Sequence, residues 1–269
     1  MVIQHNIAAI NSYRNLATNQ SALSKNLEKL SSGYKINRAG DDAAGLAISE
    51  SMRSQINGLN QAVSNANDGV GLIQTAEGAL TETHSMLQRL KTLTTQAANG
   101  TYTDTARTNI KAEVDALTTE IDRISKSTEF NGVKPLSGGS NMTFQIGATK
   151  DETLKLATAA MSAQGLGVNN ITVNNVANAN NAIDTINKAI DTVSGYRAQL
   201  GAAQNRMEHT INNLKVTSEN VTAAESRIRD TDMADEMTSY TKNNILMQAA
   251  QSMLAQSNSM PQGVLNMLQ

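Results

Sequence analysis

The side chains best suited to acid–base chemistry in this chain are its three histidines, His5, His84 and His209. They fall in three separate predicted segments, among Ser, Asn, Thr or Glu neighbours that are typical of a solvated helix face. A general base must lie within hydrogen-bonding reach of a substrate, which a solvated helix face does not arrange. The sequence also has no cysteine and no HExxH, GxSxG or Walker-type glycine loop. We therefore expect no catalytic residue, no metal or cofactor site and no enzymatic activity.

A cluster of carboxylates lies in the segment ESRIRDTDMADEM, which begins at Glu225. Acidic and basic groups are interleaved there: Asp230, Asp232, Asp235, Glu236, Arg227 and Arg229. Carboxylate oxygens could hold a divalent cation. The interleaved arginines favour the other interpretation, which is ion pairs within or between subunits.

Gly69 and Gly71, in the segment NDGVGLIQTAEGAL, superficially suggest a nucleotide-binding loop. Such a loop follows a strand, whereas these glycines lie inside a helical repeat. Glycine also leaves room for two backbones to approach each other. We therefore favour close packing of helices at this point over nucleotide binding.

The composition favours long helices around a narrow core. Hydrophobic residues make up 39% of the 269 residues, yet the chain has five Tyr, two Phe and no Trp. Large aromatic side chains usually fill wide cores and line pockets. Its two prolines, Pro135 and Pro261, leave most of the sequence free to continue a helix.

Charge is distributed unevenly along the chain. The net charge is −2, no charged residue follows Lys242, and residues 1–24 contain only Arg14. The absence of a basic run argues against nucleic-acid binding. The uncharged end is rich in Gln, Asn and Ser, which argues against membrane insertion. No basic segment followed by an apolar run marks a cleaved signal peptide.

Apolar residues repeat at spacings of four and three, as in a coiled coil. From Met52 the positions are Ile56, Leu59, Val63, Ala66, Val70, Ile73, Leu80 and Leu87, with Glu77 and His84 in the remaining slots. The pattern stops at Asn99-Gly100 and resumes from Ile110 to Ile124. A longer run comprises Ile186, Ile190, Val193, Leu200, Met207, Ile211, Leu214, Val221 and Ile228, with Arg197, Gln204, Ser218 and Glu225 between them.

These stripes predict a mainly α fold, an elongated antiparallel coiled-coil helical bundle with a small β-hairpin insert. The hairpin is expected from two alternating runs, MTFQIG from Met142 and TLKLAT from Thr153. The uncharged stretch 168–181 is expected to be irregular or strand-like. The segment SSGYKINRAGDDAAG, residues 31–45, is expected to be a loop that ends at a helix N-cap.

The two uncharged ends suggest self-assembly. Both are amphipathic, and pairing them with each other leaves apolar and amide surface exposed, which further copies of the chain would cover. Contacts between different patches generate an open helical filament. The positions that we expect in the assembly core are Ile3, Ile7, Leu16, Leu23, Leu27, Leu246, Met253, Met260 and Val264.

Several long segments resemble bacterial flagellin. They are NLEKLSSGYKINRAGDDAAGLAISESMRSQINGL from Asn26, DGVGLIQTAEGAL from Asp68, TEFNG from Thr128, LGAAQNRMEHTINNL from Leu200 and ENVTAAESRIRDTDMADEM from Glu219. The resemblance implies that residues 1–40 and 226–269 form paired helices in the inner core of a filament. Residues 41–132 and 181–225 would form the coiled-coil bundle, and residues 133–180 a short β-rich outer segment.

The same resemblance implies a structural role in swimming motility and a set of partners. The chain would be secreted unfolded by the flagellar type III export apparatus and polymerise at the filament tip. Its partners would be other flagellin copies, an export chaperone, the filament cap protein and the hook–filament junction proteins.

The resemblance also suggests recognition by host Toll-like receptor 5. Family members that the receptor senses carry the sequence LQRVREL on the first long helix and a Glu on the next. The candidate contacts here are Arg89, Leu93 and Glu113, with Lys91 and Thr92 in place of the family's Arg-Glu pair.

Two other function classes fit the sequence less well. An enzyme on a flagellin scaffold would need a metalloprotease insert, and the central residues contain no histidine. A hook–filament junction or cap-type component shares the terminal pattern but stops at short assemblies.

Overall fold

The computed structural model describes residues 6–139 and 141–267, in two compact units. One unit comprises residues 1–56 and 219–269, and the other comprises residues 57–218. We call them the terminal unit and the central unit. The elements in chain order are α1 (Ile7–Ser32), α2 (Ala43–Ala98), α3 (Asp104–Ser127), β1 (Met142–Gln145), β2 (Thr153–Leu156), α4 (Val176–Arg229) and α5 (Met233–Met267). The predicted class, a mainly α helical bundle with one β-hairpin, is confirmed.

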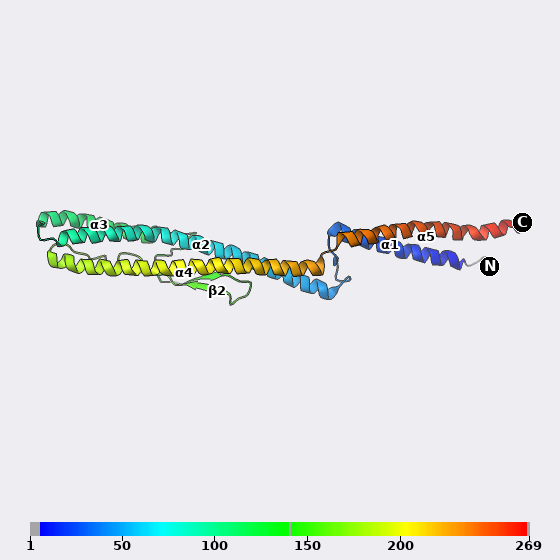
Figure 1. The fold of residues 1–269 in the computed structure, drawn as a ribbon, viewed down its shortest axis with the longest axis horizontal. Helices are drawn as coiled ribbons and strands as arrows, with labels where there is room; N and C mark the ends of the chain where they lie inside the picture. The colour runs from blue at the N-terminus through cyan, green and yellow to red at the C-terminus, as the bar shows by residue number, and fades with distance from the viewer. Residues whose placement is uncertain (1–5, 140, 268–269) are drawn as a thin grey trace. The chain divides into compact units, whose positions relative to one another are not determined.

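The central unit is an antiparallel bundle of α2, α3 and α4 (Figure 1). Antiparallel packing of α2 and α4 brings Ser218 to Asn60 and Arg197 to Glu77, so that higher numbers on one helix meet lower numbers on the other. A hydrogen bond from Arg107 stabilises the turn between α2 and α3: its Nε donates to the Ala97 carbonyl at 3.0 Å. That bond satisfies a carbonyl at the end of α2 that the helix itself leaves without a partner.

The buried seam of α2 matches the predicted one at Leu59, Ala66, Ile73, Leu80 and Leu87 and is shifted by one residue at the alternate positions. It runs at spacings of three and four through Leu59, Ala62, Ala66, Gly69, Ile73, Ala76, Leu80, Thr83, Leu87, Leu90, Thr94 and Ala97. The slots assigned to Val63, Val70, Glu77 and His84 therefore belong to the smaller residues Ala62, Gly69, Ala76 and Thr83. The residue that faces the neighbouring helices at these slots is the smaller one, because a densely packed seam has room there for a small side chain.

The same offset occurs on α4. Tyr196 and Ala203 are buried where the sequence pattern suggested Arg197 and Gln204. Glu77 and Arg197 instead flank the seam, and their charged atoms lie 3.5 Å apart. This ion pair therefore lies beside the seam, although the sequence pattern places both of its residues in core slots.

Gly69 lies where α2 packs closely against α4. A Cβ atom on Gly69 would meet the Cε atom of Met207 at 2.9 Å and the Cδ1 atom of Phe144 at 3.2 Å. Helix packing is therefore close at Gly69, but the atoms that come nearest are side-chain atoms of Met207 and Phe144 rather than a second backbone. A Cβ atom on Gly71 would instead meet the Cζ atom of the Phe130 ring at 3.5 Å, an ordinary van der Waals distance.

The hairpin is confirmed: β1 and β2 pair antiparallel from Met142 opposite Leu156 to Gln145 opposite Thr153. A second, shorter antiparallel pairing joins Phe130 to Val133 across an Asn-Gly turn. In this turn Asn131 and Gly132 have φ of 49° and 82°. Positive φ at both residues is the requirement of a type I′ turn. Phe130 and Val133 exchange both backbone hydrogen bonds across it, at 2.9 and 3.0 Å.

Residues 133–180 pack into the core of the central unit. Their buried side chains are Leu136, Leu154, Leu156, Met161, Ala163, Leu166, Val168, Ile171, Val173 and Ala179, and they belong to one hydrophobic cluster with the helices. Outside the four-residue strands most of the segment is irregular. The expectation of irregular structure fails from residue 176 onward, because the side chain of Asn175 accepts a hydrogen bond from the backbone N–H of Asn178 and caps α4. The boundaries predicted after residues 40, 132, 180 and 225 concern layers of a filament and stay predictions.

Candidate assembly surface

In the terminal unit, α1 packs antiparallel against α5 (Figure 1). Near one end the Lys29 Nζ lies 3.8 Å from Oε2 of Glu236, and near the other the Asn6 side-chain amide donates to the Ser257 carbonyl at 2.7 Å. Between residues 9 and 26, partly or fully buried side chains recur on α1 at spacings of three and four, with Ala22 beside them: Ala9, Ser12, Leu16, Asn19, Leu23 and Asn26. Half of this seam is polar, so the helix pair buries little apolar surface by itself.

Large apolar side chains remain exposed on both helices. They are Ile7, Ile10, Tyr13 and Leu27 on α1, and Met233, Met237, Ile245, Leu246, Met253 and Met260 on α5, with exposed fractions from 41% to 65%. Scattered exposed apolar residues are common on soluble proteins, but a set of this size on two adjacent helices marks an interaction surface. We call this set the apolar surface of the terminal unit.

The residues predicted for the assembly core divide between the helix pair and this surface. Leu16 and Leu23 are half-buried within α1 and α5 packing. The others that the structure describes are exposed: Ile7, Leu27, Leu246, Met253 and Met260. Ile3 and the side chain of Val264 lie outside the described residues.

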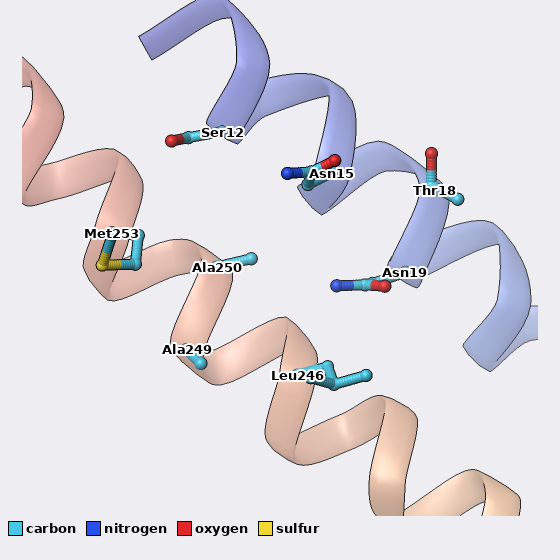
Figure 2. Close-up of a pocket in the computed structure, with 8 residues that line it drawn as sticks. All are labelled: Ser12, Asn15, Thr18, Asn19, Leu246, Ala249, Ala250 and Met253. Atoms are coloured by element: carbon cyan, nitrogen blue, oxygen red, sulfur yellow. The ribbon is translucent and has the colours of Figure 1, made fainter. Parts of the chain in front are cut away.

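A groove of about 360 Å³ opens between α1 and α5. One wall carries Ser12, Asn15, Thr18 and Asn19 from α1, and the other carries Leu246, Ala249, Ala250 and Met253 from α5. Figure 2 shows the side chains of Asn19, Ala250 and Leu246 pointing into the space between the helices. The groove therefore has one polar, uncharged wall and one apolar wall.

A cluster around Arg229 ties the loop after α1 to the ends of α2 and α4. Its guanidinium lies over the Tyr34 ring, 4.8 Å from the centroid, and its Nη1 lies 2.6 Å from Oε1 of Glu50. The hydrogen bond from Arg229 holds the pKa of Glu50 below its ordinary value. A backbone hydrogen bond adds to these side-chain contacts, because the Lys35 N–H donates to the Arg229 carbonyl at 2.7 Å. We call Tyr34, Glu50 and Arg229 the Arg229 clamp.

The predicted loop ends at a helix N-cap, as expected: α1 stops at Ser32, and the Asp42 carboxylate accepts from the Gly45 N–H at 2.9 Å at the start of α2. Asp41 holds the preceding turn, since it accepts from the N–H groups of Asn37 and Arg38. Hydrogen bonds from these backbone groups, that of Arg38 first, lower the pKa of Asp41.

The carboxylates near the start of α5 form ion pairs and a helix cap. Arg229 pairs with Glu50 on α2, and Glu236 pairs with Lys29 on α1. Asp232 accepts from the Ala234 N–H at 2.8 Å and caps α5. Among the residues that the structure describes, no three His, Asp or Glu side chains are grouped so as to hold a metal ion. The ion-pair interpretation is confirmed for Arg229 and Glu236.

Arg89 and Glu113, on α2 and α3, form an ion pair with Nη2 and Oε1 2.8 Å apart. Both side chains are about half exposed, at 54% and 44%. Leu93 is only 3% exposed and packs in the core of the bundle. Of the histidines, His84 contacts Gln88 at 3.0 Å on the surface of α2, His209 is exposed on α4, and His5 lies outside the described residues.

Comparison with known proteins identifies the chain. Residues 3–141 match the family model of the bacterial flagellin N-terminal helical region, and residues 183–268 match that of the C-terminal helical region. The chain belongs to the bacterial flagellin family.

Similar flagellins cover the whole chain. The flagellin of Bacillus subtilis (strain 168) is 52% identical over the full length of both chains. The flagellar filament 33 kDa core protein of Treponema phagedenis is 47% identical, again over the full length of both. The crystal structure of Bacillus cereus flagellin superimposes with a TM-score of 0.52 at 30% identity, covering 60% of this chain and 94% of that one.

This flagellin is therefore a structural subunit of the bacterial flagellar filament, an extracellular polymer of flagellin copies that serves motility. Within the described ranges, no helix has both the length and the apolar character needed to cross a membrane.

Sequence reasoning missed the Arg229 clamp and the polar wall of the groove. Tyr34 and Arg229 are far apart in the chain, and no periodic pattern connects them. The sequence does carry a sign of the polar wall, because the polar residues Ser12 and Asn19 are seven residues apart and so lie on one face of α1.

Proposed function

We propose that this flagellin polymerises through its terminal unit, with α1 and α5 in the inner core of the filament. The apolar surface of the terminal unit supports the proposal most strongly, because it is large and uncovered in the single chain. Fully burying one Leu, Ile or Met side chain contributes about 1.5–3 kcal/mol. Several such side chains at each contact provide a strong driving force for addition of a subunit.

The absence of charge at both ends favours the same conclusion. Taking a charged group out of water costs several kcal/mol unless it finds a partner. After Lys242 the chain has no charged residue, and before Lys25 it has only Arg14. Burial between copies therefore carries almost no cost of removing charges from water. The part of this surface that lies before Lys25 and after Lys242 can be covered by other uncharged surface without a matching set of ion pairs.

We also propose that the chain is secreted unfolded by the flagellar export apparatus and polymerises at the filament tip. An export chaperone would bind the C-terminal segment, a cap protein would guide addition of subunits, and hook–filament junction proteins would hold the base of the filament. Membership of the flagellin family supports these partners. The lack of cysteine supports export in an unfolded form, because folding afterwards needs no disulfide formation.

Deletion of residues 243–269 tests polymerisation through the terminal unit. The shortened chain should keep a helical circular dichroism spectrum and fail to elongate seeds of the full-length protein. Leu246→Lys should have the same effect, because it places a charge on the apolar surface. Thr119→Lys, at an exposed position on α3, is the matched control and should elongate normally. Normal filaments from the deleted chain would refute the proposal.

Electron microscopy of the same samples separates a filament subunit from a junction or cap-type component. Seeded full-length protein should form long, uniform filaments. Short stubs that stop growing at high monomer concentration would favour the junction component instead.

Recognition by Toll-like receptor 5 is a second proposed function. The exposed ion pair of Arg89 and Glu113 supports it, because it holds two candidate contacts together on one face. Leu93 is buried, so it would not touch the receptor itself. It would contribute by holding α2 in place beneath the exposed ion pair.

A receptor reporter assay with Arg89→Ala and Glu113→Ala tests this recognition, and both variants should signal less than the wild type. The control is Lys111→Ala, which removes the neighbouring exposed ion pair to Asp115 on α3. An unchanged response of all three variants would overturn the proposal.

A further inference from the structure

The groove between α1 and α5 has the character of a site for another protein surface. Its volume, about 360 Å³, falls in the range of small-molecule pockets, about 300–1,000 Å³. It lacks the aromatic lining and charged groups with which such pockets commonly bind and orient a small molecule. Its polar wall and apolar wall together suit side chains that have an apolar body and a polar, uncharged tip.

The α1 helix carries a stripe of three large exposed side chains, of which Tyr13 has an apolar ring with a polar tip and the two isoleucines are wholly apolar. Ile7, Ile10 and Tyr13 are spaced by three residues and are 62%, 57% and 65% exposed. At about 100° per residue, Ile10 lies roughly 140° around the helix from Asn15 in the groove wall. Tyr13, roughly 160° from Asn15, is directed away from the groove of the same chain as Ile10 is, whereas Ile7, roughly 80° from Asn15, lies closer to the groove wall.

We propose that the groove of one flagellin copy receives the stripe of Ile7, Ile10 and Tyr13 from a second copy. Leu246 and Met253 offer apolar contacts to the two isoleucines and to the tyrosine ring. The amides and hydroxyls of the opposite wall offer hydrogen-bond partners to the tyrosine hydroxyl. The inference rests on the proposed polymerisation through the terminal unit and names the two surfaces that meet there.

The charges near both surfaces are compatible with this contact. The groove contains no charged side chain, and the one charged residue beside the stripe is Arg14, whose Nη2 donates to Asn11 at 3.0 Å. Two different surfaces of the same chain meet, so the contact is heterologous. Repetition of a heterologous contact generates an open helical array unless the rotation closes a ring. An open helical array is the symmetry that a filament requires.

Cross-linking within filaments tests this contact, because the natural chain has no cysteine to interfere. Monomers with Tyr13→Cys are mixed with monomers carrying Leu246→Cys, Ala249→Cys or Met253→Cys, polymerised on wild-type seeds and oxidised. Cysteines form a disulfide when their Cα atoms are within about 7 Å. At least one groove position should give several-fold more mixed dimer than the control, Met237→Cys, which is equally exposed on α5 but outside the groove.

Filaments in which no groove position exceeds the control would overturn the assignment of surfaces. Polymerisation through the terminal unit would stand in that case, since it is tested separately, by whether chains lacking residues 243–269 still polymerise.

A measurement without cysteines examines the same contact. Tyr13→Ala should raise the monomer concentration needed to elongate wild-type seeds several-fold, and Tyr13→Phe should raise it less because the ring remains. Ser21→Ala, at an exposed position farther along α1, is the control. Equal effects of Tyr13→Ala and Ser21→Ala would also overturn the proposal.

Discussion

The guanidinium of Arg229 lies over the ring of Tyr34, with 4.8 Å between the guanidinium carbon and the ring centroid. The two residues come from opposite ends of the sequence, and the backbone around them is bonded as well, since the Thr231 N–H donates to the Gly33 carbonyl at 3.0 Å. The Arg229 clamp therefore holds the loop between α1 and α2 against the residues that join α4 to α5.

Loss of the clamp should loosen the loop. Arg229→Ala removes the contact with the tyrosine ring, which contributes about 0.5–2 kcal/mol, together with the bond to Glu50. Trypsin should then cleave faster at Lys35 and Arg38, which lie in the loop. Arg227→Ala, which changes an exposed arginine on the same helix, is the control and should leave the rate unchanged. Equal cleavage of both variants would show that the clamp does not restrain the loop.

Glu50 should make the clamp sensitive to acid. Its pKa is lowered in the folded chain, chiefly by the hydrogen bond from Arg229, so folding favours the charged carboxylate. The stabilisation is fully present above the unfolded pKa, about 4.3, and is lost as the pH falls through the lower folded pKa. The cleavage rate of the loop in wild type should therefore rise at acidic pH toward that of Glu50→Gln. Parallel pH profiles of the two proteins, measured with an acid-tolerant protease, would contradict this.

Gly69 and Gly78 should respond in opposite directions to a larger side chain. Gly69→Leu would force atoms into Met207 and Phe144, and overpacking of this kind costs about 1–3 kcal/mol. Gly78 is a comparison position on the same helix, because a Cβ there would meet no atom within 4 Å. Gly78→Ala should stabilise the chain by about 0.5–1 kcal/mol, as alanine does in a helix interior. Urea unfolding of the monomer followed by circular dichroism measures both changes.

The central residues should contribute to stability as core residues do. Leu136 is fully buried, whereas Val133, three residues earlier, is 43% exposed. Leu136→Ala should lower the free energy of unfolding by about 2–5 kcal/mol, and Val133→Ala should change it little. Similar small effects for both would mean that residues 133–180 are not part of the core.

Local patterns were enough to predict the hairpin, the turn after α2 and the long helices. The strands were visible because Phe144 and Leu154 alternate with polar neighbours, and the turn because Asn99-Gly100 interrupts the repeat. These features depend on neighbours in the sequence. The uncharged ends were equally plain, since the absence of charge is a property of composition.

Packing partners that are distant in sequence could not be predicted. The exact seam of α2 depends on what α4 presents to it, so that Gly69 rather than Val70 faces Met207. Burial of Leu136 and Val168 likewise depends on helices that precede and follow them. The groove between α1 and α5 arises only when the two ends of the chain pack together.

Hydrogen–deuterium exchange of backbone amides, compared between monomers and filaments, tests most directly whether other copies cover the terminal unit. Amides of α1 and of residues 233–260 should exchange much more slowly in the filament. Amides in the core of the central unit, around Leu80 and Leu200, should change little, because their side chains are already buried in the single chain. Equal exchange of α1 and α5 in monomers and filaments would contradict the account.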